Sequence, residues 1–500
     1  MRLLQRGWMF LAVTIGCAYG QEQKPLNHHQ ASGPSFTVRE QSPELCDAGS
    51  RYWTGTINIT AEKSMFFWYF ESRHKPETDP VLLWMSGGPG ATGELGLTMG
   101  SGPCVVNPDG NSTSRREFSW TDHANVVYID QPIGVGFSHI TDRDEIAVNL
   151  QQGARDVHSF LSILSTEVFP ELSGRPWHIT GESMGGHYVI GYSHYLATLE
   201  GNTTPRTNVS TAVIIDGYID TAHQTVGLYD FFCTNWAFDS RKAPLMNDTA
   251  CADMAAAIPS CEKMGAYCRG SYDITVCEAA AKACEETVGE YFFSEIRPGG
   301  WDPYDSRHTC KTPPLCSNFN HGATWRFFNQ PWVQEKLGFS HSPFELIDFD
   351  TNQRWQDAKF VFLPVTQEMT WLLDNTDIRI LFINGNNDII MYVPKDSGRM
   401  IRFFQAYGYS SNTPGQMRLL DEQPWKGQAQ YRSMGYKDWY FSQGDLTLDR
   451  EGWNVKRGGF WKGTDRLALY AVDDAGHFAP FHQPEAVGAV LKAWLGTSSA

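Results

Sequence analysis

The sequence predicts an α/β fold in which helices cover both faces of a mostly parallel central sheet. Short, continuous apolar runs recur along the chain, as parallel strands buried on both faces require. Helical patterns lie between several of these runs. Gly-, Asn- and Asp-containing loops follow the carboxyl ends of the runs, where open sheets of this kind hold their functional groups. No internal repeat competes with this interpretation.

Each element is expected from its own pattern. The segment around 53–70 is dense in strand formers. Six apolar runs are expected to form the core strands, at 81–85, 125–129, 176–180, 212–215, 378–383 and 467–472. Helices are expected at 145–160, 185–199 and 484–495.

The chain divides into five segments. A positive start, an apolar stretch from Trp8 to Ala18 and small residues up to Gly20 are typical of a secretory signal peptide; the alternative is a buried N-terminal helix. The expected segments are a signal peptide at 1–20, a polar tail or pro-segment at 21–45, core at 46–219, a cysteine-rich cap insertion at 220–345, and core again at 346–496.

Composition and charge exclude several classes of protein. The 500 residues are 41% hydrophobic and 19% charged, which is typical of globular chains. The net charge is −16, and no basic stripe could follow a phosphate backbone, so we expect no nucleic-acid partner. Beyond the signal peptide no apolar stretch is long enough to span a membrane, and we expect no membrane anchor.

Cysteines and sequons favour an oxidising compartment. Ten cysteines remain after signal removal, which allows up to five disulfides whose connectivity the sequence does not determine. No C-x-x-C pair or H-E-x-x-H motif occurs, so we expect no metal. N-glycosylation sequons stand at Asn58, Asn111, Asn202, Asn208 and Asn247.

A nucleophile motif follows the third core run. Gly181-Glu-Ser-Met-Gly185 leads from the strand at 176–180 into a helix, the context that a G-x-S-x-G turn needs. Such a turn exposes the Ser183 hydroxyl at the positive end of the helix. The alternative is a structural glycine-rich turn. An exposed serine needs a base and an orienting acid, and in this fold they follow in the order Ser, Asp, His.

The last two core runs supply those partners. Asp388 follows the run at 378–383, and His477 follows the run at 467–472. We predict that His477 takes the proton of Ser183 and that Asp388 orients the imidazole. His482 competes with His477, and Asp473 or Asp474 with Asp388.

Backbone amides are expected to stabilise the oxyanion. The residue after the nucleophile, Met184, offers one N–H, and Gly88 offers another because glycine lets the backbone approach closely. Gly88-Pro-Gly-Ala-Thr-Gly93 also matches a dinucleotide fingerprint, but Pro89 in the turn argues against it, and we expect no cofactor.

These segments resemble the serine carboxypeptidase family of α/β-hydrolases. The similar segments are 66–72, 84–90, 119–120, 130–138, 181–188, 384–388 and 476–477, in family order. The resemblance implies a Ser183–His477–Asp388 triad, an oxyanion hole at Gly88 and Met184, a disulfide-rich insertion, and release of C-terminal residues from peptides at acidic pH, either outside the cell or in a vacuole or lysosome.

The resemblance also implies a site for the terminal carboxylate of the substrate, at Glu182, Ser86 and Gly87. A protonated Glu182 would donate a hydrogen bond to that carboxylate, whereas its alternative role is to cap the following helix. Three positions depart from the family: Ser86 replaces an asparagine, Ala91 a disulfide cysteine and Gly100 a glutamate. The departure at Ala91 implies that one disulfide is rearranged or absent.

The leading hypothesis is therefore a secreted serine-type carboxypeptidase that acts on peptide or protein C-termini, as a monomer or homodimer. The loss of the asparagine and glutamate keeps open an esterase or acyltransferase with the same triad. A third hypothesis is a glycoprotein that binds without catalysis.

Overall fold

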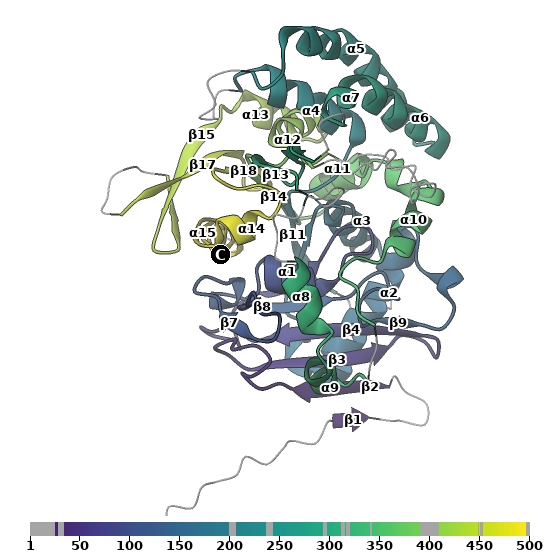
Figure 1. Cartoon of the computed structure of the whole chain (residues 1–500), viewed down its shortest axis with the longest axis vertical. Helices are drawn as coiled ribbons and strands as arrows, with labels where there is room; N and C mark the ends of the chain where they lie inside the picture. The colour runs from purple at the N-terminus through teal and green to yellow at the C-terminus, as the bar shows by residue number, and fades with distance from the viewer. Residues whose placement is uncertain are drawn as a thin grey trace, which may run out of the picture.

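A mixed sheet forms the centre of the molecule (Figure 1). The computed structural model describes residues 26–28, 35–199, 207–236, 244–293, 298–311, 316, 321–340, 343–390, 410–448, 450 and 454–496. Within these residues the sheet has 14 strands. The six in its middle are parallel and correspond to the six predicted runs: β8 (Asn125–Ile129), β5 (Val81–Met85), β10 (Trp177–Glu182), β11 (Val209–Ile215), β14 (Arg379–Gly385) and β18 (Leu467–Val472).

Antiparallel strands extend both edges of this parallel centre. On one side lie β4 (Lys63–Phe70), β3 (Tyr52–Asn58), β2 (Phe36–Glu40) and β1 (Leu26–His28), and β9 (His139–Ile140) pairs with β4. On the other side lie β17 (Lys456–Gly463), β15 (Lys437–Ser442) and β16 (Asp445–Thr447). The sheet is thus parallel only at its centre, where the predicted runs lie.

Part of the segment 21–45, predicted as a polar tail or pro-segment, is a strand of the sheet; whether the segment is removed stays a prediction. Phe36–Glu40 is strand β2, and Phe36 pairs with Ile57 of β3. The physical reason is a short alternation of apolar and polar residues, which buries Val38 on the sheet. The predicted signal peptide lies outside the described residues.

Helices cover both faces of the sheet because successive side chains of a strand point to opposite faces. Leu83 of β5 packs with one hydrophobic cluster and Trp84 with the other. The first face carries α2 (Leu150–Ile163), α3 (Gly185–Thr198) and α11 (Thr366–Asn375). The second carries α1 (Gly93–Met99), α8 (His321–Phe328), α9 (Pro331–Leu337) and α15 (Pro484–Gly496).

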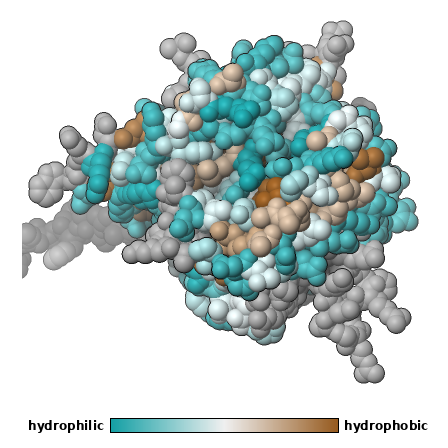
Figure 2. Space-filling model, turned by 90° about the horizontal axis from the view of Figure 1, so that it is seen from above, coloured by the Kyte–Doolittle hydropathy of each residue, from teal (hydrophilic) through white to brown (hydrophobic). Residues whose placement is uncertain are grey.

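A helical cap stands at one end of the molecule, at the top of Figure 1. It contains α4 (Thr221–Cys233), α5 (Asp248–Ser271), α6 (Ile274–Cys284) and α7 (Glu290–Phe293). Figure 2 shows that this end is mainly hydrophilic, with a narrow hydrophobic band. The remaining elements are short: β6 (Cys104–Val106), β7 (Thr113–Arg115), β12 (Trp301–Asp302), β13 (Asp305–Thr309), α10 (Phe349–Asp357), α12 (Thr413–Glu422), α13 (Gln428–Ser433) and α14 (Ala479–His482).

The predicted cap boundaries, 220–345, need two corrections. Helices α8 and α9 pack on the sheet through Phe328 and Val333, so they belong to the core. Conversely, α12 from the second core segment packs against α4. In both cases, contacts between apolar residues far apart in the sequence determine whether a helix belongs to the cap or to the core. The density of cysteines in the sequence gives no information about these contacts.

All ten cysteines beyond the predicted signal peptide are paired. Three disulfides staple the cap helices, one closes the β12–β13 region, and one joins the start of the core to β6; the pairs are Cys233–Cys251, Cys261–Cys284, Cys268–Cys277, Cys310–Cys316 and Cys46–Cys104. The prediction of up to five disulfides is confirmed, and the absence of a cysteine at position 91 leaves no unpaired partner among these ten. Among the described helices, none combines the length and apolar character needed to cross a membrane.

Candidate active site

Ser183 lies in a strained turn between β10 and α3. Its φ is +63°, in the left-handed region that non-glycine residues rarely adopt. Space forces small residues on either side: a Cβ on Gly181 would lie 2.8 Å from the Gly185 carbonyl oxygen, and a Cβ on Gly185 would lie 3.0 Å from that of Met85. The turn therefore holds the serine at the carboxyl edge of the sheet and at the amino end of α3.

His477 and Asp388 form a buried pair at the same edge of the sheet. The Nδ1 atom of His477 lies 3.0 Å from the Oδ2 atom of Asp388. The other oxygen, Oδ1, accepts a hydrogen bond from the Ile390 amide at 2.8 Å. Because an ionised carboxylate only accepts, this contact puts the imidazole hydrogen on Nδ1. No residue that the structure describes makes a hydrogen bond to Nε2 of His477, so this nitrogen remains available to accept a proton.

The competing residues are engaged elsewhere. Nδ1 of His482 accepts a hydrogen bond from the Gly476 amide at 3.1 Å. Asp473 accepts one from the Asn386 side chain at 2.9 Å and also pairs with Arg457. The geometry thus brings Asp388 to His477, and neither Asp473 nor Asp474.

Ser183 and His477 line one pocket, a space of about 930 Å³ that includes volume open to the solvent. No hydrogen bond joins their side chains in the described part of the chain, as is common before a substrate tightens the geometry. The other lining residues come from loops at the carboxyl edge and from the segments beside the cap: Ser86, Gly87, Gly88, Ala91, Leu95, Glu182, Tyr218, Tyr304, His321, Ile347, Phe349, Asn352, Gln356, Ile390, Ser411 and Phe478.

Two backbone amides in this pocket lack partners. Among the described residues, nothing accepts a hydrogen bond from the N–H of Gly88 or of Met184. Gly87 lets this loop approach the nucleophile closely, because a Cβ there would lie 2.6 Å from the Met184 nitrogen and 2.7 Å from the Ser183 Cβ. The loop that carries Gly88 therefore lies against the Met184 amide and the nucleophile, and the oxyanion hole at Gly88 and Met184 stays a prediction.

Glu182 is buried in the pocket wall with an unsatisfied oxygen. Its Oε1 atom has no hydrogen-bond partner within the described chain. Burial and, second, the negative charge of Asp388 raise the pKa of Glu182 well above its ordinary value. The group is therefore a neutral acid over a wider range than an exposed glutamate, and it can donate a hydrogen bond.

Of the other residues predicted to bind a carboxylate, Ser86 and Gly87 line the pocket. The Ser86 hydroxyl accepts a hydrogen bond from the Trp84 indole at 3.2 Å. Gly100, in contrast, ends α1 and is not among the lining residues.

The sequence analysis missed two polar residues of this site. Asp216, directly after β11, accepts hydrogen bonds from the Gly385 amide at 2.6 Å and the Ala479 amide at 3.4 Å. It thus ties together the loops that carry Asp388 and His477. Its place after a core strand was a usable signal. Ser411 contacts both members of the pair, but it follows no core strand, and nothing in the local sequence marks it.

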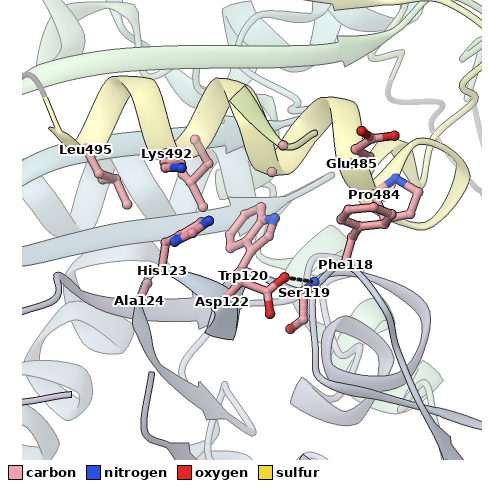
Figure 3. A pocket seen from close by; sticks show the side chains of 13 residues that line it. Phe118, Ser119, Trp120, Asp122, His123, Ala124, Pro484, Glu485, Lys492 and Leu495 are labelled. Atoms are coloured by element: carbon pink, nitrogen blue, oxygen red, sulfur yellow. Dashed lines mark hydrogen bonds between the residues drawn. The ribbon is translucent and has the colours of Figure 1, made fainter. Parts of the chain in front are cut away.

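A second, smaller pocket lies between residues 118–124 and α15 (Figure 3). The Ser119 amide donates a hydrogen bond to Asp122 there, at 2.9 Å. It shares no lining residue with the pocket of Ser183. In the described residues, no group of three His, Cys, Asp or Glu side chains could hold a metal ion.

Four of the predicted glycosylation sites are described: Asn58, Asn111, Asn208 and Asn247 are all exposed. Asn202 lies outside the described residues. Occupancy of the sequons stays a prediction.

The parallel centre, the strained serine turn and the buried His–Asp pair place the chain in the class of α/β-hydrolases. A family model described as serine carboxypeptidase matches residues 43–497. The chain therefore belongs to the serine carboxypeptidase family, whose members are serine-type hydrolases. This confirms the resemblance inferred from the motifs.

Individual relatives agree with that family. The chain is similar to carboxypeptidase Y of Schizosaccharomyces pombe, with 26% identity over 96% of this chain and 45% of that protein, so it spans less than half of that relative. It is similar to a carboxypeptidase Y homolog of Phaeosphaeria nodorum, with 27% identity over 97% of this chain and 80% of that protein. A vacuolar serine-type carboxypeptidase of Saccharomyces cerevisiae is 25% identical over 90% of this chain and 80% of that protein.

A solved structure shares the fold. The crystal structure of Kex1, a prohormone-processing carboxypeptidase from Saccharomyces cerevisiae, superposes with a TM-score of 0.68. The match covers 90% of this chain and 92% of that one at 19% identity.

Proposed function

We propose that this protein is a serine-type carboxypeptidase that releases C-terminal residues from peptides through an acyl-enzyme on Ser183. The observation that carries the proposal is the buried Asp388–His477 pair, which lines the same pocket as the strained serine. Family membership supports the reaction class, and the geometry supports the roles that we propose for these residues.

In the first half-reaction, the Ser183 oxygen attacks the carbonyl carbon of the last peptide bond. Nε2 of His477 takes the hydroxyl proton, and Asp388 stabilises the imidazolium that forms. The carbonyl oxygen becomes an oxyanion that the amides of Gly88 and Met184 bind. The imidazolium then gives its proton to the leaving amine, the C–N bond breaks, and the C-terminal amino acid departs.

In the second half-reaction, water replaces the departed amino acid. His477 takes a proton from this water, whose oxygen attacks the acyl ester. Collapse of the second tetrahedral intermediate breaks the ester bond and returns the proton to Ser183. The shortened peptide leaves with a new terminal carboxylate.

Glu182 gives the site its preference for a free C-terminus. A neutral carboxyl with an unpaired Oε1 donates a hydrogen bond to the substrate carboxylate, whereas an ionised one repels it. Ser86 and Gly87 form the adjoining wall. Binding therefore favours acidic pH, because the raised pKa of Glu182 keeps the group neutral there.

One observation favours a second candidate function. The Ser86 oxygen already accepts a hydrogen bond from the Trp84 indole. The Ser86 side chain is also shorter than that of the asparagine that the family resemblance implies. A weaker hold on the carboxylate would leave an esterase or acyltransferase on the same triad. Matched substrates with free, amidated and esterified C-termini separate the two, because only a carboxypeptidase prefers the free acid.

We propose secretion as the destination, with a vacuole or lysosome-like compartment as the alternative. The five disulfides fit any oxidising compartment. Fractionation of cells that express the full chain, with digestion of its glycans, tests the destination and the sequons together.

The central experiment is a time course on an unbiased peptide mixture, read by mass spectrometry. Successive loss of single C-terminal residues supports the proposal. Internal cleavage, or no cleavage together with ester hydrolysis, overturns it. Ser183→Ala, purified in parallel, is the control for contaminating peptidases.

A further inference from the structure

A buried hydroxyl lies directly behind the His477–Asp388 pair. Ser411 is 1% exposed and lines the pocket. Its Oγ atom donates a hydrogen bond to Asp388 Oδ2 at 2.6 Å and lies 3.4 Å from His477 Nδ1. One carboxylate oxygen therefore serves both the imidazole and this hydroxyl.

These contacts complete the surroundings of the carboxylate. Oδ1 of Asp388 is held by the Ile390 amide, while Oδ2 is held by His477 and Ser411. Asp388 itself has no exposed surface. A fully buried carboxylate is stable only when hydrogen bonds replace the lost water, and Ser411 provides one of the three that the described residues make.

The backbone of Ser411 is anchored independently of its hydroxyl. Its carbonyl oxygen accepts a hydrogen bond from the Asn384 side chain at 2.9 Å. Asn384 belongs to β14, the strand that leads to Asp388. The same side chain donates to Thr413, at the start of α12, at 3.0 Å. Removal of the hydroxyl therefore leaves this segment attached to the sheet.

We infer that Ser411 is a positioning residue of the hydrolytic site, which sets the charge and orientation of Asp388 and, through it, the basicity of His477. The inference deepens the proposed function and rests on it. Ser411 acts by holding Asp388, which in turn orients His477.

The direction of the effect follows from charge. Without the hydroxyl, less of the negative charge of Asp388 is neutralised by hydrogen bonding, so the carboxylate attracts the imidazolium proton more strongly. The acidic limb of the pH–rate profile should move to higher pH.

Two other acids face this pair and must be held constant. Glu182 stands at the end of β10 and Asp216 after β11. Burial and then the charge of Asp388 raise the pKa of each. Tyr304 and Phe478 are aromatic neighbours of the imidazole. None of these groups changes in the variants below, so the comparison isolates the hydroxyl.

The experiment measures the rate of covalent labelling of Ser183 by an uncharged organophosphonate across the pH range. This probe carries no terminal carboxylate, so it reports the triad without the carboxylate-binding role of Glu182. We expect Ser411→Ala to react about 10-fold more slowly at the acidic end, the effect of one lost hydrogen bond to a charged group. We also expect its acidic limb to lie at higher pH than in the wild type.

Ser410→Ala is the matched control. Ser410 is equally buried, but its hydroxyl accepts a hydrogen bond from Asn412 at 2.6 Å and lies 3.4 Å from the Ile389 carbonyl oxygen. It should keep the wild-type limb. Ser411→Cys keeps a weak donor at nearly the same volume and should fall between wild type and Ser411→Ala.

Each outcome is decisive. An unmoved acidic limb in both Ser411→Ala and Ser411→Cys, or an equal shift in Ser410→Ala, overturns the inference while leaving the proposed function intact. A wild-type enzyme that the probe does not label overturns both. The shift in the Ser411 variants alone supports the positioning role.

Discussion

Two clusters in the described part of the chain combine a histidine with carboxylates, and we propose that only the first of them performs chemistry. The catalytic cluster contains Asp388, His477 and the nearby Glu182. The junction cluster, defined as Asp220, His223, Arg269 and Glu422, joins α4, α5 and α12. The residue types are similar, so the difference lies in which atoms are left without a partner.

The junction cluster is saturated. Asp220 lies 3.1 Å from Nδ1 of His223, and Glu422 lies 3.0 Å from its Nε2. Arg269 contacts both oxygens of Asp220, at 3.3 and 3.2 Å. Neither ring nitrogen can take a proton from a substrate, because each already faces a carboxylate.

The catalytic cluster leaves its functional atoms unpaired. Among the described residues, Nε2 of His477, Oε1 of Glu182 and the amides of Gly88 and Met184 have no protein partner. All of these residues line one pocket or flank its nucleophile. A buried group without a partner costs free energy, so such atoms mark places where a substrate supplies the missing partner.

The largest difference between the clusters should appear in turnover. His477→Gln should lower kcat by at least about 10⁴-fold, because the base is lost. His223→Gln should leave kcat within about twofold, because neither of its nitrogens reaches the pocket. Steady-state kinetics on a blocked dipeptide at acidic pH measures both, with circular dichroism to verify folding. A comparable loss in the two variants would show that the junction cluster belongs to the active site.

The next effect concerns stability. Asp220→Asn should lower the free energy of unfolding by about 1.5–3 kcal/mol, because Arg269 loses this charged partner and His223 keeps only Glu422. Denaturant titration at pH 5 measures it. Asp248→Asn, in the exposed first turn of α5, is the control and should change stability by less than about 0.5 kcal/mol. A small effect in both variants would mean that water reaches the junction.

Substrate affinity should respond to the unpaired acid. As pH rises through the raised pKa of Glu182, the group ionises and repels the substrate carboxylate, so KM for free-acid peptides should climb by about 10-fold or more. C-terminally amidated peptides should show little such rise. In Glu182→Gln the amide donates at every pH, and the rise should disappear. Identical pH profiles for the free and amidated peptides would refute this role.

The last effect is a dependence of cap stability on pH. Burial opposes the charge of His223, but Asp220 and Glu422 outweigh it and raise the pKa of His223. The contribution of protonated His223 to cap stability is therefore complete below about pH 6.5. It is lost as the pH rises through the raised pKa of His223. At Asp220, His223 and Arg269 outweigh burial and lower the pKa, so its contribution is lost only as the pH falls below about 4.

Thermal unfolding of wild type and His223→Gln between pH 4 and 9 tests this dependence. The free energy of unfolding of the wild type should be about 1–3 kcal/mol larger than that of the variant near pH 5. This difference should shrink above neutral pH. A difference that stays constant across the range would assign the effect of the substitution to packing alone.

Much of the core was predictable because its signals are local. An apolar run such as 81–85 predicts a strand that is buried on both faces of the sheet. The glycines around Ser183 indicate a turn with no room for larger side chains. Polar residues after the runs could be assigned to one edge because parallel strands end together. Strand β2 was missed because its alternation is short and lies within a polar segment.

The cap and its attachments were less predictable. Nothing near α8 or α9 indicates that Phe328 and Val333 pack on the sheet, and nothing near α12 indicates that it packs on α4. Such contacts depend on which surfaces meet after the chain has crossed the molecule. Cysteine spacing indicated a stapled insertion, but the pairing required coordinates.

By itself, the amino-acid order determined the strand-and-helix alternation and placed a serine, an acid and an imidazole at three strand ends, because periodicity and turn chemistry act over a few residues. The tertiary structure alone decided which hydrogen-bonding atoms are satisfied. Ser411 meets Asp388, and His223 is enclosed between two acids, only through packing of distant segments. Whether a buried polar atom has a hydrogen-bond partner depends on the folded interior. There, each hydrogen bond lost to water is replaced by one to the protein, or the atom stays unpaired until a substrate binds.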